Sequence, residues 1–164
     1  MSTRYTTIEI EKEYLHFSAA HFTIFSATER ERLHGHNFFV AIKVTSEVGE
    51  NGMCFDYNVL KNTLRTICER YDEYMLIPAA SPYLNIEEDD THYILKFNDE
   101  VLTYLKSDCL LLPVLNITVE ELSSHLLDLL VEDKDAVSAM KLSDIELKVS
   151  SGPGQWGVAK WSSG

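Results

Sequence analysis

The chain has few cysteines and no long apolar run. The first shortage argues against disulfide-rich and thiolate-cluster proteins, and the second against membrane-spanning proteins. Its 164 residues include three cysteines, Cys54, Cys68 and Cys109, without a Cys-x-x-Cys pair. A disulfide framework and a thiolate metal cluster are therefore not expected, and a reducing compartment fits better. The longest apolar stretch, 109–115, is too short to span a bilayer. Residues 1–14 lack the apolar run of a signal peptide. We expect a cytoplasmic protein without a membrane partner.

Basic residues are also scarce. Asp and Glu number 26 against 14 Lys and Arg, giving a formal net charge of -12. Such a chain repels a phosphate backbone, so we expect no nucleic-acid partner. An anionic substrate would need local positive charge, which a bound divalent cation can supply. With 45% hydrophobic residues, the length predicts one globular domain over residues 1–164.

Periodicity predicts the order strand, strand, helix, hairpin, helix, strand, and therefore an α+β class. The two prolines within 75–83 predict an irregular segment there. Thr118 begins a capping-box pattern before a helix whose buried face is expected to include Leu122, Leu126 and Leu129. The predicted strands are 5–17 (with a bulge near 11–13), 34–44, 93–97, 101–105 and 145–149, and the helices follow Asp56, ending near Tyr71, and Thr118.

Three histidines carry the strongest functional signal. His34 and His36 flank Gly35 at the start of a predicted strand, so their side chains project from the same face. His21, thirteen residues before His34, can add a third imidazole from a neighbouring strand. Three such ligands leave the fourth position of a tetrahedral zinc to water or substrate, as in catalytic zinc sites. The alternative is that they are ordinary surface or core histidines.

Five ordered segments make the chain resemble the 6-pyruvoyl-tetrahydropterin synthase and 6-carboxytetrahydropterin synthase family. They are Phe17-Ser-Ala-Ala-His21, Leu33-His-Gly-His-Asn-Phe38, Gly52-Met-x-x-Asp56, the stretch 111–120 and Pro153-Gly-Gln155. The resemblance implies a tunnelling fold, with a four-stranded antiparallel sheet, two helices on one face and an extra hairpin. It also implies assembly into barrels as homo-trimers or hexamers, with active sites between subunits. His21, His34 and His36 fall on the family's Zn²⁺ ligands.

The residues that surround such a zinc depart from the family pattern. Family members use a cysteine shortly before His-Gly-His as a base, but residues 26–32 contain none. Glu31 stands three before His34, which is similar to a branch of the family that releases the pterin side chain as 6-hydroxymethyl-dihydropterin. A carboxylate can act as this base if burial raises its pKa. The alternative for Glu31 is an exposed loop charge.

Two further elements of the pattern are altered. The family's Asp-His pair after the first helix is Asp72-Glu73 here, so the carboxylate has no imidazole to orient. His125 could substitute, although a packed histidine is the simpler interpretation. The glutamate that anchors the pterin's amino-pyrimidine edge aligns with Ser150 and Ser151, and a serine cannot accept two parallel N–H bonds.

Thr118 and Glu120 match the family's Thr-x-Glu segment, which supports the substrate, although both also suit a helix N-terminus. We expect Glu31, Asp72 and Glu73 to be catalytic, and Thr118, Glu120 and Ser151 to bind substrate. Cys54 could be a relocated nucleophile, or a small buried hydrophobe.

The preferred function is a zinc-dependent lyase acting on a small molecule, a dihydropterin such as dihydroneopterin triphosphate, in queuosine or folate biosynthesis. The alternatives are a divergent zinc-binding paralogue with another ligand or no activity, and a purely structural ring.

Overall fold

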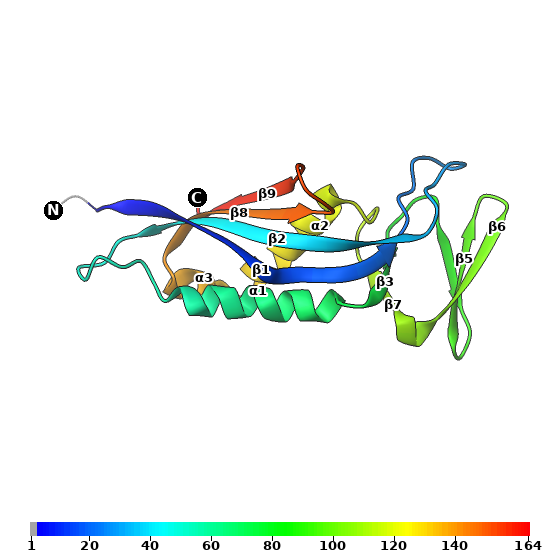
Figure 1. Cartoon of the computed structure of the whole chain (residues 1–164), viewed down its shortest axis with the longest axis horizontal. Coiled ribbons are helices and arrows are strands. Elements are labelled where there is room, and N and C mark those ends of the chain that lie inside the picture. The colour runs from blue at the N-terminus through cyan, green and yellow to red at the C-terminus, as the bar shows by residue number, and fades with distance from the viewer. Residues whose placement is uncertain (1–2) are drawn as a thin grey trace.

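The computed structural model describes residues 3–164 and shows helices packed against long strands, with a small sheet at one end (Figure 1). No helix in this range is long and apolar enough to cross a membrane. The elements are β1 (Tyr5–His21), β2 (His34–Glu47), α1 (Tyr57–Tyr71), β3 (Tyr74–Pro78), β4 (Asn85–Glu88), β5 (His92–Phe97), β6 (Glu100–Leu105), the short 3₁₀ helix η1 (Lys106–Asp108), β7 (Cys109–Leu112), α2 (Val119–Glu132), α3 (Lys134–Ala139), β8 (Leu142–Ser150) and β9 (Gly157–Ser162).

The two longest strands, β1 and β2, form an antiparallel pair that runs along the molecule (Figure 1). Their register shifts between Glu11 and His16, which confirms the predicted bulge. Beyond the bulge the apolar side chains alternate cleanly: Phe17 and Phe38 are buried, whereas His16 and Phe39 are exposed. The alternation fixes which face of each strand meets the helices.

The main sheet has six strands in the order β7-β3-β1-β2-β8-β9. It is mixed, because β3 runs parallel to both β1 and β7 while the other pairs are antiparallel. The predicted four-stranded antiparallel sheet was therefore too small. Periodicity missed β7 and β3 because short strands of a parallel pair read as continuous apolar runs rather than as alternation.

The prediction of an irregular segment over 75–83 was wrong for its first part, because Tyr74–Pro78 is strand β3. β1 pairs with β3 only at Tyr74 and Met75. At Pro78 one side of the strand is consequently free of that ladder, and a proline without an N–H is tolerated there.

Both predicted helices are confirmed, and they pack with the main sheet in one hydrophobic core. Asp56 caps α1 by accepting a hydrogen bond from the Asn58 N–H at 2.9 Å. Thr118 caps α2 by accepting from the Glu121 N–H at 3.3 Å, but the Glu121 carboxylate accepts from the Leu115 N–H instead of completing a capping box. On α2, Leu122 and Leu126 are buried as predicted, whereas Leu129 is half-buried.

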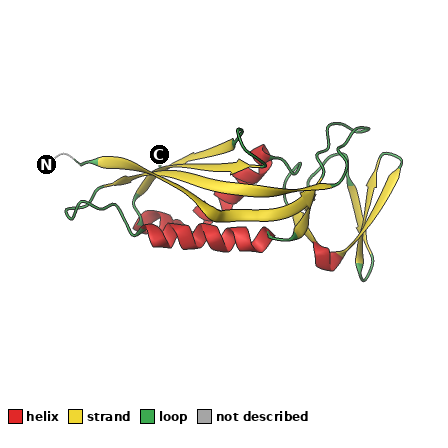
Figure 2. Ribbon diagram, in the orientation of Figure 1, coloured by secondary structure: helices red, strands yellow, loops and turns green. Residues whose placement is uncertain are grey.

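Charged residues cross β1, β2, β8 and β9 in a single row of alternating sign. Glu9 is paired with Lys43, Lys43 with Glu146, and Glu146 with Lys160. All four lie in the exposed or half-buried positions between the core residues of their strands. This face is therefore polar. The helices lie against the opposite face of the sheet (Figure 2), where the apolar side chains form the core.

The predicted hairpin is confirmed as β5 and β6, and β4 extends it to a three-stranded sheet. This sheet stands at one end of the long strands, beside the connection between β1 and β2 (Figure 1). A second hydrophobic cluster joins it to that connection, through Phe22, Ile24, Leu95 and Phe97 among others.

Candidate metal centre and surrounding site

The β1–β2 pairing brings the three predicted histidines together. His21 lies directly opposite His34, and Ala19 lies opposite His36. Because side chains two apart share a face, all three imidazoles converge, and one ring nitrogen from each lies within 4.8 Å of the others. The structure therefore brings together the three histidines that the sequence predicts as metal ligands, and their binding of a metal stays a prediction.

Backbone carbonyls orient two of these rings. His21 Nδ1 lies 2.9 Å from the Ile117 carbonyl oxygen, and His34 Nδ1 lies 2.7 Å from that of Arg32. With each Nδ1–H donating to its carbonyl, both Nε2 atoms are left with a lone pair. The Nε2 atoms of His34 and His36 are 2.9 Å apart.

The fit to a zinc ion rests on His21. Its Nε2 is buried and has no hydrogen-bond partner among the described residues, an unfavourable state for a polar atom. A cation held between three imidazole nitrogens would satisfy it, and neutral nitrogen donors are ligands that zinc accepts. The residues present therefore fit Zn²⁺.

The protonation of the rings agrees with this fit. Burial, with a smaller contribution from the neighbouring imidazoles, lowers the pKa of His21 below its ordinary value. Burial and then His34 lower the pKa of His36 in the same way. Both rings are therefore neutral near pH 7, and the neutral ring is the form that binds metals.

Glu31 reaches the same cluster from the β1–β2 connection. Its Oε2 lies 3.7 Å from His34 Nε2 and accepts a hydrogen bond from the Thr23 N–H at 3.1 Å. Partial burial raises the pKa of Glu31, but the hydrogen bonds from Thr23 and the nearby His34 and His21 outweigh it, so this pKa lies below its ordinary value. The condition that burial raises this pKa is therefore not met, and Glu31 is ionised at neutral pH.

Asp72 and Glu73 lie at the end of α1 and are fixed to β1. Asp72 Oδ1 accepts from the Ser18 N–H at 2.8 Å, and the Glu73 N–H donates to the Ser18 carbonyl at 2.7 Å. Within residues 3–164, neither carboxylate hydrogen-bonds or ion-pairs with the histidines or Glu31. The chain alone does not unite them with the metal centre.

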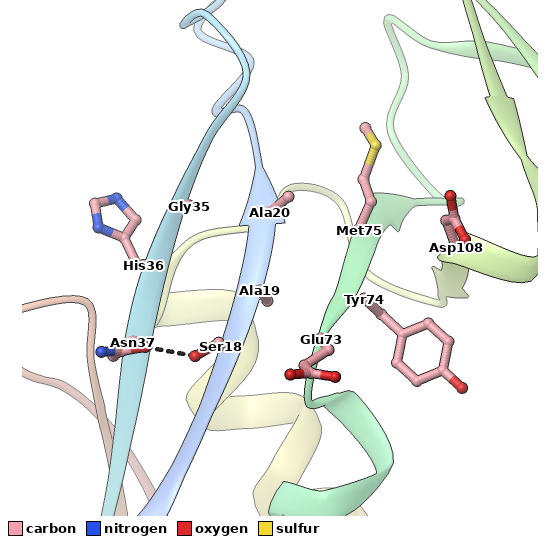
Figure 3. A pocket seen from close by; sticks show the side chains of 10 residues that line it. All are labelled: Ser18, Ala19, Ala20, Gly35, His36, Asn37, Glu73, Tyr74, Met75 and Asp108. Atoms are coloured by element: carbon pink, nitrogen blue, oxygen red, sulfur yellow. Dashed lines mark hydrogen bonds between the residues drawn. The ribbon is translucent and has the colours of Figure 1, made fainter.

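Glu73 instead lines a cleft of about 530 Å³, together with Ser18, Asn37, Tyr74 and Asp108. In Figure 3 strands β1 and β2 lie between the Glu73 carboxylate and the His36 ring, although both residues line this cleft. The Ser18 hydroxyl donates to the Asn37 side-chain oxygen at 2.5 Å and links the two strands there.

A comparison with known families decides how this site is classified. The family model described as 6-pyruvoyl tetrahydropterin synthase matches residues 9–158, which is nearly the whole chain. The chain belongs to the 6-pyruvoyl tetrahydropterin synthase family. The resemblance inferred from the five sequence segments is thereby confirmed.

Relatives and solved structures agree with this membership. A Pyrococcus abyssi protein, provisionally named 6-carboxy-5,6,7,8-tetrahydropterin synthase, is 25% identical over 71% of this chain and 70% of its own length. The structure of 6-pyruvoyl tetrahydropterin synthase from Plasmodium vivax is similar with a TM-score of 0.92, at 26% identity over 97% of this chain and 99% of that one. The Plasmodium falciparum enzyme gives 0.91, at 27% identity over 96% and 98%.

Two further solved structures of the P. vivax synthase carry alanine or cysteine in place of a glutamate that is described as a catalytic residue. Both match this chain with a TM-score of 0.92. A catalytic glutamate is therefore known within the 6-pyruvoyl tetrahydropterin synthase family.

The three predicted substrate-binding residues lie at the start of α2 and just after β8. Thr118 is occupied in capping α2, and Glu120 is exposed in the first turn of that helix. Ser151 follows β8, whose Ser150 pairs with Phe39, three residues along β2 from His36. The hydroxyl of Ser150 is itself hydrogen-bonded to the backbone of Gly152. Substrate binding by Thr118, Glu120 and Ser151 stays a prediction.

The two side chains considered as substitutes lie elsewhere. His125 Nε2 is 2.9 Å from the Tyr71 hydroxyl, in the half-buried contact between α2 and α1, which agrees with a packed histidine. Cys54 Sγ lies 3.7 Å from the Ser46 carbonyl oxygen, near the end of β2, whereas the histidines are at its start. Because a strand rises by about 3.3 Å per residue, the thiol and His34 lie near opposite ends of the long strand β2.

Sequence reasoning missed the groups that orient the site. The carbonyls of Ile117 and Arg32 hold two imidazoles, and backbone carbonyls leave no trace in residue type. Asn116 was also missed, because its partner is 92 positions away: its side chain accepts from the Ile24 N–H at 3.1 Å and donates to the Ile24 carbonyl at 2.8 Å. An asparagine amide can pair in this way with both the N–H and the carbonyl of one residue.

Proposed function

We propose that the chain is a zinc-dependent lyase whose substrate is a dihydropterin such as dihydroneopterin triphosphate. The observation that carries the proposal is the convergence of His21, His34 and His36, with the Glu31 carboxylate 3.7 Å from His34. Membership of the 6-pyruvoyl tetrahydropterin synthase family supports the pterin-synthase type of chemistry.

In the proposed mechanism, Glu31 is the general base. Its carboxylate is ionised at neutral pH and is fixed by the Thr23 N–H, so it can accept a proton from the substrate's side chain without first moving. A zinc ion held by the three histidines would supply Lewis-acid stabilisation of negative charge on a substrate oxygen. The neutral His21 and His36 rings, together with the carbonyl-oriented His34, are arranged to hold it.

Glutamate in place of cysteine favours one outcome among the family's reactions. We propose that Glu31 promotes release of the pterin side chain, giving 6-hydroxymethyl-dihydropterin. The catalytic glutamate described in the P. vivax synthase supports a carboxylate in this role. A location in the cytoplasm remains part of the proposal.

Asp72 and Glu73 enter the mechanism only if subunits assemble. We propose that homo-trimers or hexamers close the sheets into a barrel and place these two carboxylates in the site of a neighbouring copy. The cleft beside Glu73, open on β1 and β2, is where such a copy would add residues. Glu120 and Ser151 would then contact the substrate.

Ser150 and Ser151 favour a second candidate, a zinc-binding paralogue with a non-pterin ligand. They stand where the family has its anchoring glutamate, and the Ser150 hydroxyl is already hydrogen-bonded to Gly152. A site without that carboxylate should bind an amino-pyrimidine edge less selectively. Mass spectrometry of the small molecule that co-purifies with the protein separates the two candidates, and a pterin would exclude the second.

The direct test is turnover of dihydroneopterin triphosphate by zinc-loaded protein, with products identified by mass spectrometry. We expect Glu31→Ala to lower kcat by ~10²–10⁴-fold, the usual contribution of a general base. Glu29→Ala is the matched control, because Glu29 lies exposed in the same connection. The proposal fails if the parent protein neither binds nor converts this substrate, or if Glu31→Ala is as active as Glu29→Ala.

A further inference from the structure

The three-stranded sheet β4–β6 touches the segment that carries Glu31. Phe22 and Ile24, which begin the β1–β2 connection, share a hydrophobic cluster with Leu95 and Phe97 of β5. This cluster is separate from the main core beneath the long sheet. The packing of the connection therefore depends on the three-stranded sheet as well as on β1 and β2.

Arg30 links the β1–β2 connection to the three-stranded sheet through a charged contact. Its Nε donates to Glu100 Oε2 of β6 at 2.6 Å, and its Nη1 donates to the Glu31 carbonyl oxygen at 2.9 Å. The guanidinium also lies 5.0 Å from the centre of the Phe22 ring. Only 16% of the Arg30 side chain is exposed, so its guanidinium is better shielded from water than that of an ordinary surface ion pair, although Glu100 is half exposed. The rigid fork of arginine can hold both oxygens at once.

Within the β1–β2 connection, residues 23 and 24 are hydrogen-bonded to residues 30 and 31. Ile24 and Arg30 form an isolated antiparallel bridge, and the Glu31 N–H donates to the Thr23 carbonyl at 2.8 Å. The Thr23 N–H in turn donates to the Glu31 carboxylate. A shift of Arg30 therefore moves both the backbone and the side-chain partner of Glu31.

We propose that Glu100, acting through Arg30, is a positioning residue that holds the Glu31 carboxylate against His34. On this proposal the three-stranded sheet is part of the catalytic apparatus, which rests on the function proposed above for Glu31. A general base works only when it is held within reach of its proton, and misplacement by about 1 Å can cost two orders of magnitude in rate.

The matched control lies in the same small sheet. Lys96 Nζ lies 2.6 Å from Glu87 Oε1, the same length as the Arg30–Glu100 contact. The Glu87 and Glu100 side chains are each 49% exposed. The Glu87 pair joins β4 to β5 and has no recorded contact with the connection in residues 3–164.

Steady-state kinetics of zinc-loaded Glu100→Ala, Glu100→Gln and Glu87→Ala test the proposal. We expect Glu100→Ala to lower kcat about tenfold with little change in KM, because the base is displaced while the substrate contacts remain. Glu100→Gln should fall between Glu100→Ala and the parent, because the amide keeps an acceptor but loses the charge. Glu87→Ala should behave as the parent.

Hydrogen exchange at the Thr23 and Glu31 amides gives a second readout that needs neither zinc nor activity. Glu100→Ala should exchange faster at both amides, and Glu87→Ala at the parental rate. The proposal is overturned if Glu100→Ala equals Glu87→Ala in kcat or in amide exchange. If the parent has no activity on dihydroneopterin triphosphate, the proposed function fails, and the exchange rates alone decide whether Glu100 positions Glu31.

Discussion

At the scale of single residues, the site depends on how neutral nitrogens and one carboxylate are held. His21 is buried with its Nδ1 bonded to Ile117 and its Nε2 directed at the other imidazoles. Glu31 is fixed through the Thr23 backbone. Backbone groups are already ordered by the fold, so no second side chain has to be fixed to orient the imidazoles and the carboxylate. Their metal-facing and proton-accepting atoms therefore keep one direction.

His125 carries a prediction about pH. Burial lowers its pKa, and Asp128 and Glu132 offset this only in part. Below the ordinary histidine pKa of about 6.5, the unfolded chain therefore binds more protons than the folded chain. The free energy of unfolding should fall as pH decreases through that value and level off below the folded pKa.

Urea unfolding of metal-free protein between pH 8 and 5 checks this. His125→Gln should lose less stability on acidification than the parent, because the neutral amide can still bond to the Tyr71 hydroxyl. His92→Gln, which alters the half-buried histidine at the start of β5, is the control and should follow the parent. Parallel curves for His125→Gln and the parent would contradict the assignment.

The convergence of the three histidines could be predicted from sequence, because residue type and the strand period of two are enough to define it. His34 and His36 needed only a strand, and His21 needed only an adjacent one. The lowered pKa of Glu31 could not be predicted, because it depends on hydrogen bonds from Thr23 that form only in the folded chain. The Arg30–Glu100 contact spans seventy positions and has no local signature.

At the scale of elements, the close approach of β9 to α2 governs the segment that carries Thr118 and Glu120. A Cβ on Gly157 would lie 2.4 Å from the Val119 carbonyl oxygen, a backbone atom that cannot move aside easily. Gly152, before the same strand, has no atom within 4 Å of such a Cβ. Glycine at 157 is therefore what allows the strand to reach the start of the helix.

We expect Gly157→Ala to lower the free energy of unfolding by ~1–3 kcal/mol, the usual cost of forcing volume into a packed contact. Gly152→Ala should cost less than about 1 kcal/mol. Denaturant unfolding of both variants measures the difference. Equal stability of the two would show that β9 does not press on α2.

Sequence patterns located the amphipathic elements and missed the others. Helices α1 and α2 have caps and a 3.6-residue apolar period that propensity can detect. Strand β9 was missed because it follows a glycine-rich turn that ends the preceding pattern, and because its exposed face holds both Val158 and Lys160, so polarity does not alternate along it. Strand β7 has four consecutive apolar or small residues, which do not distinguish a strand from a buried loop.

At the scale of the whole molecule, the sheet has two open edges, at β7 and β9. Unpaired edges are places where another copy can add strands. The polar face with its row of alternating charges from Glu9 to Lys160 suits a water-filled interior better than a packed one. These features support assembly of the sheets around a polar lumen.

Multi-angle light scattering of the purified protein should give three or six times the mass of one chain. Trimers or hexamers would bring Asp72 and Glu73 to a neighbouring copy. A monomer that still turns over dihydroneopterin triphosphate would contradict their proposed role, and Asp72→Asn should then leave its kcat unchanged.

Zinc-edge X-ray absorption of the purified protein, with and without dihydroneopterin triphosphate, tests most directly whether the three histidines hold a zinc ion that binds substrate. We expect one zinc per chain with three imidazole nitrogens, no sulfur, and a fourth ligand that changes when the substrate is added. His34→Ala should lose this spectrum, whereas His92→Ala should keep it. A protein that binds no zinc, or whose zinc spectrum does not respond to the substrate, would contradict a zinc-centred dihydropterin lyase.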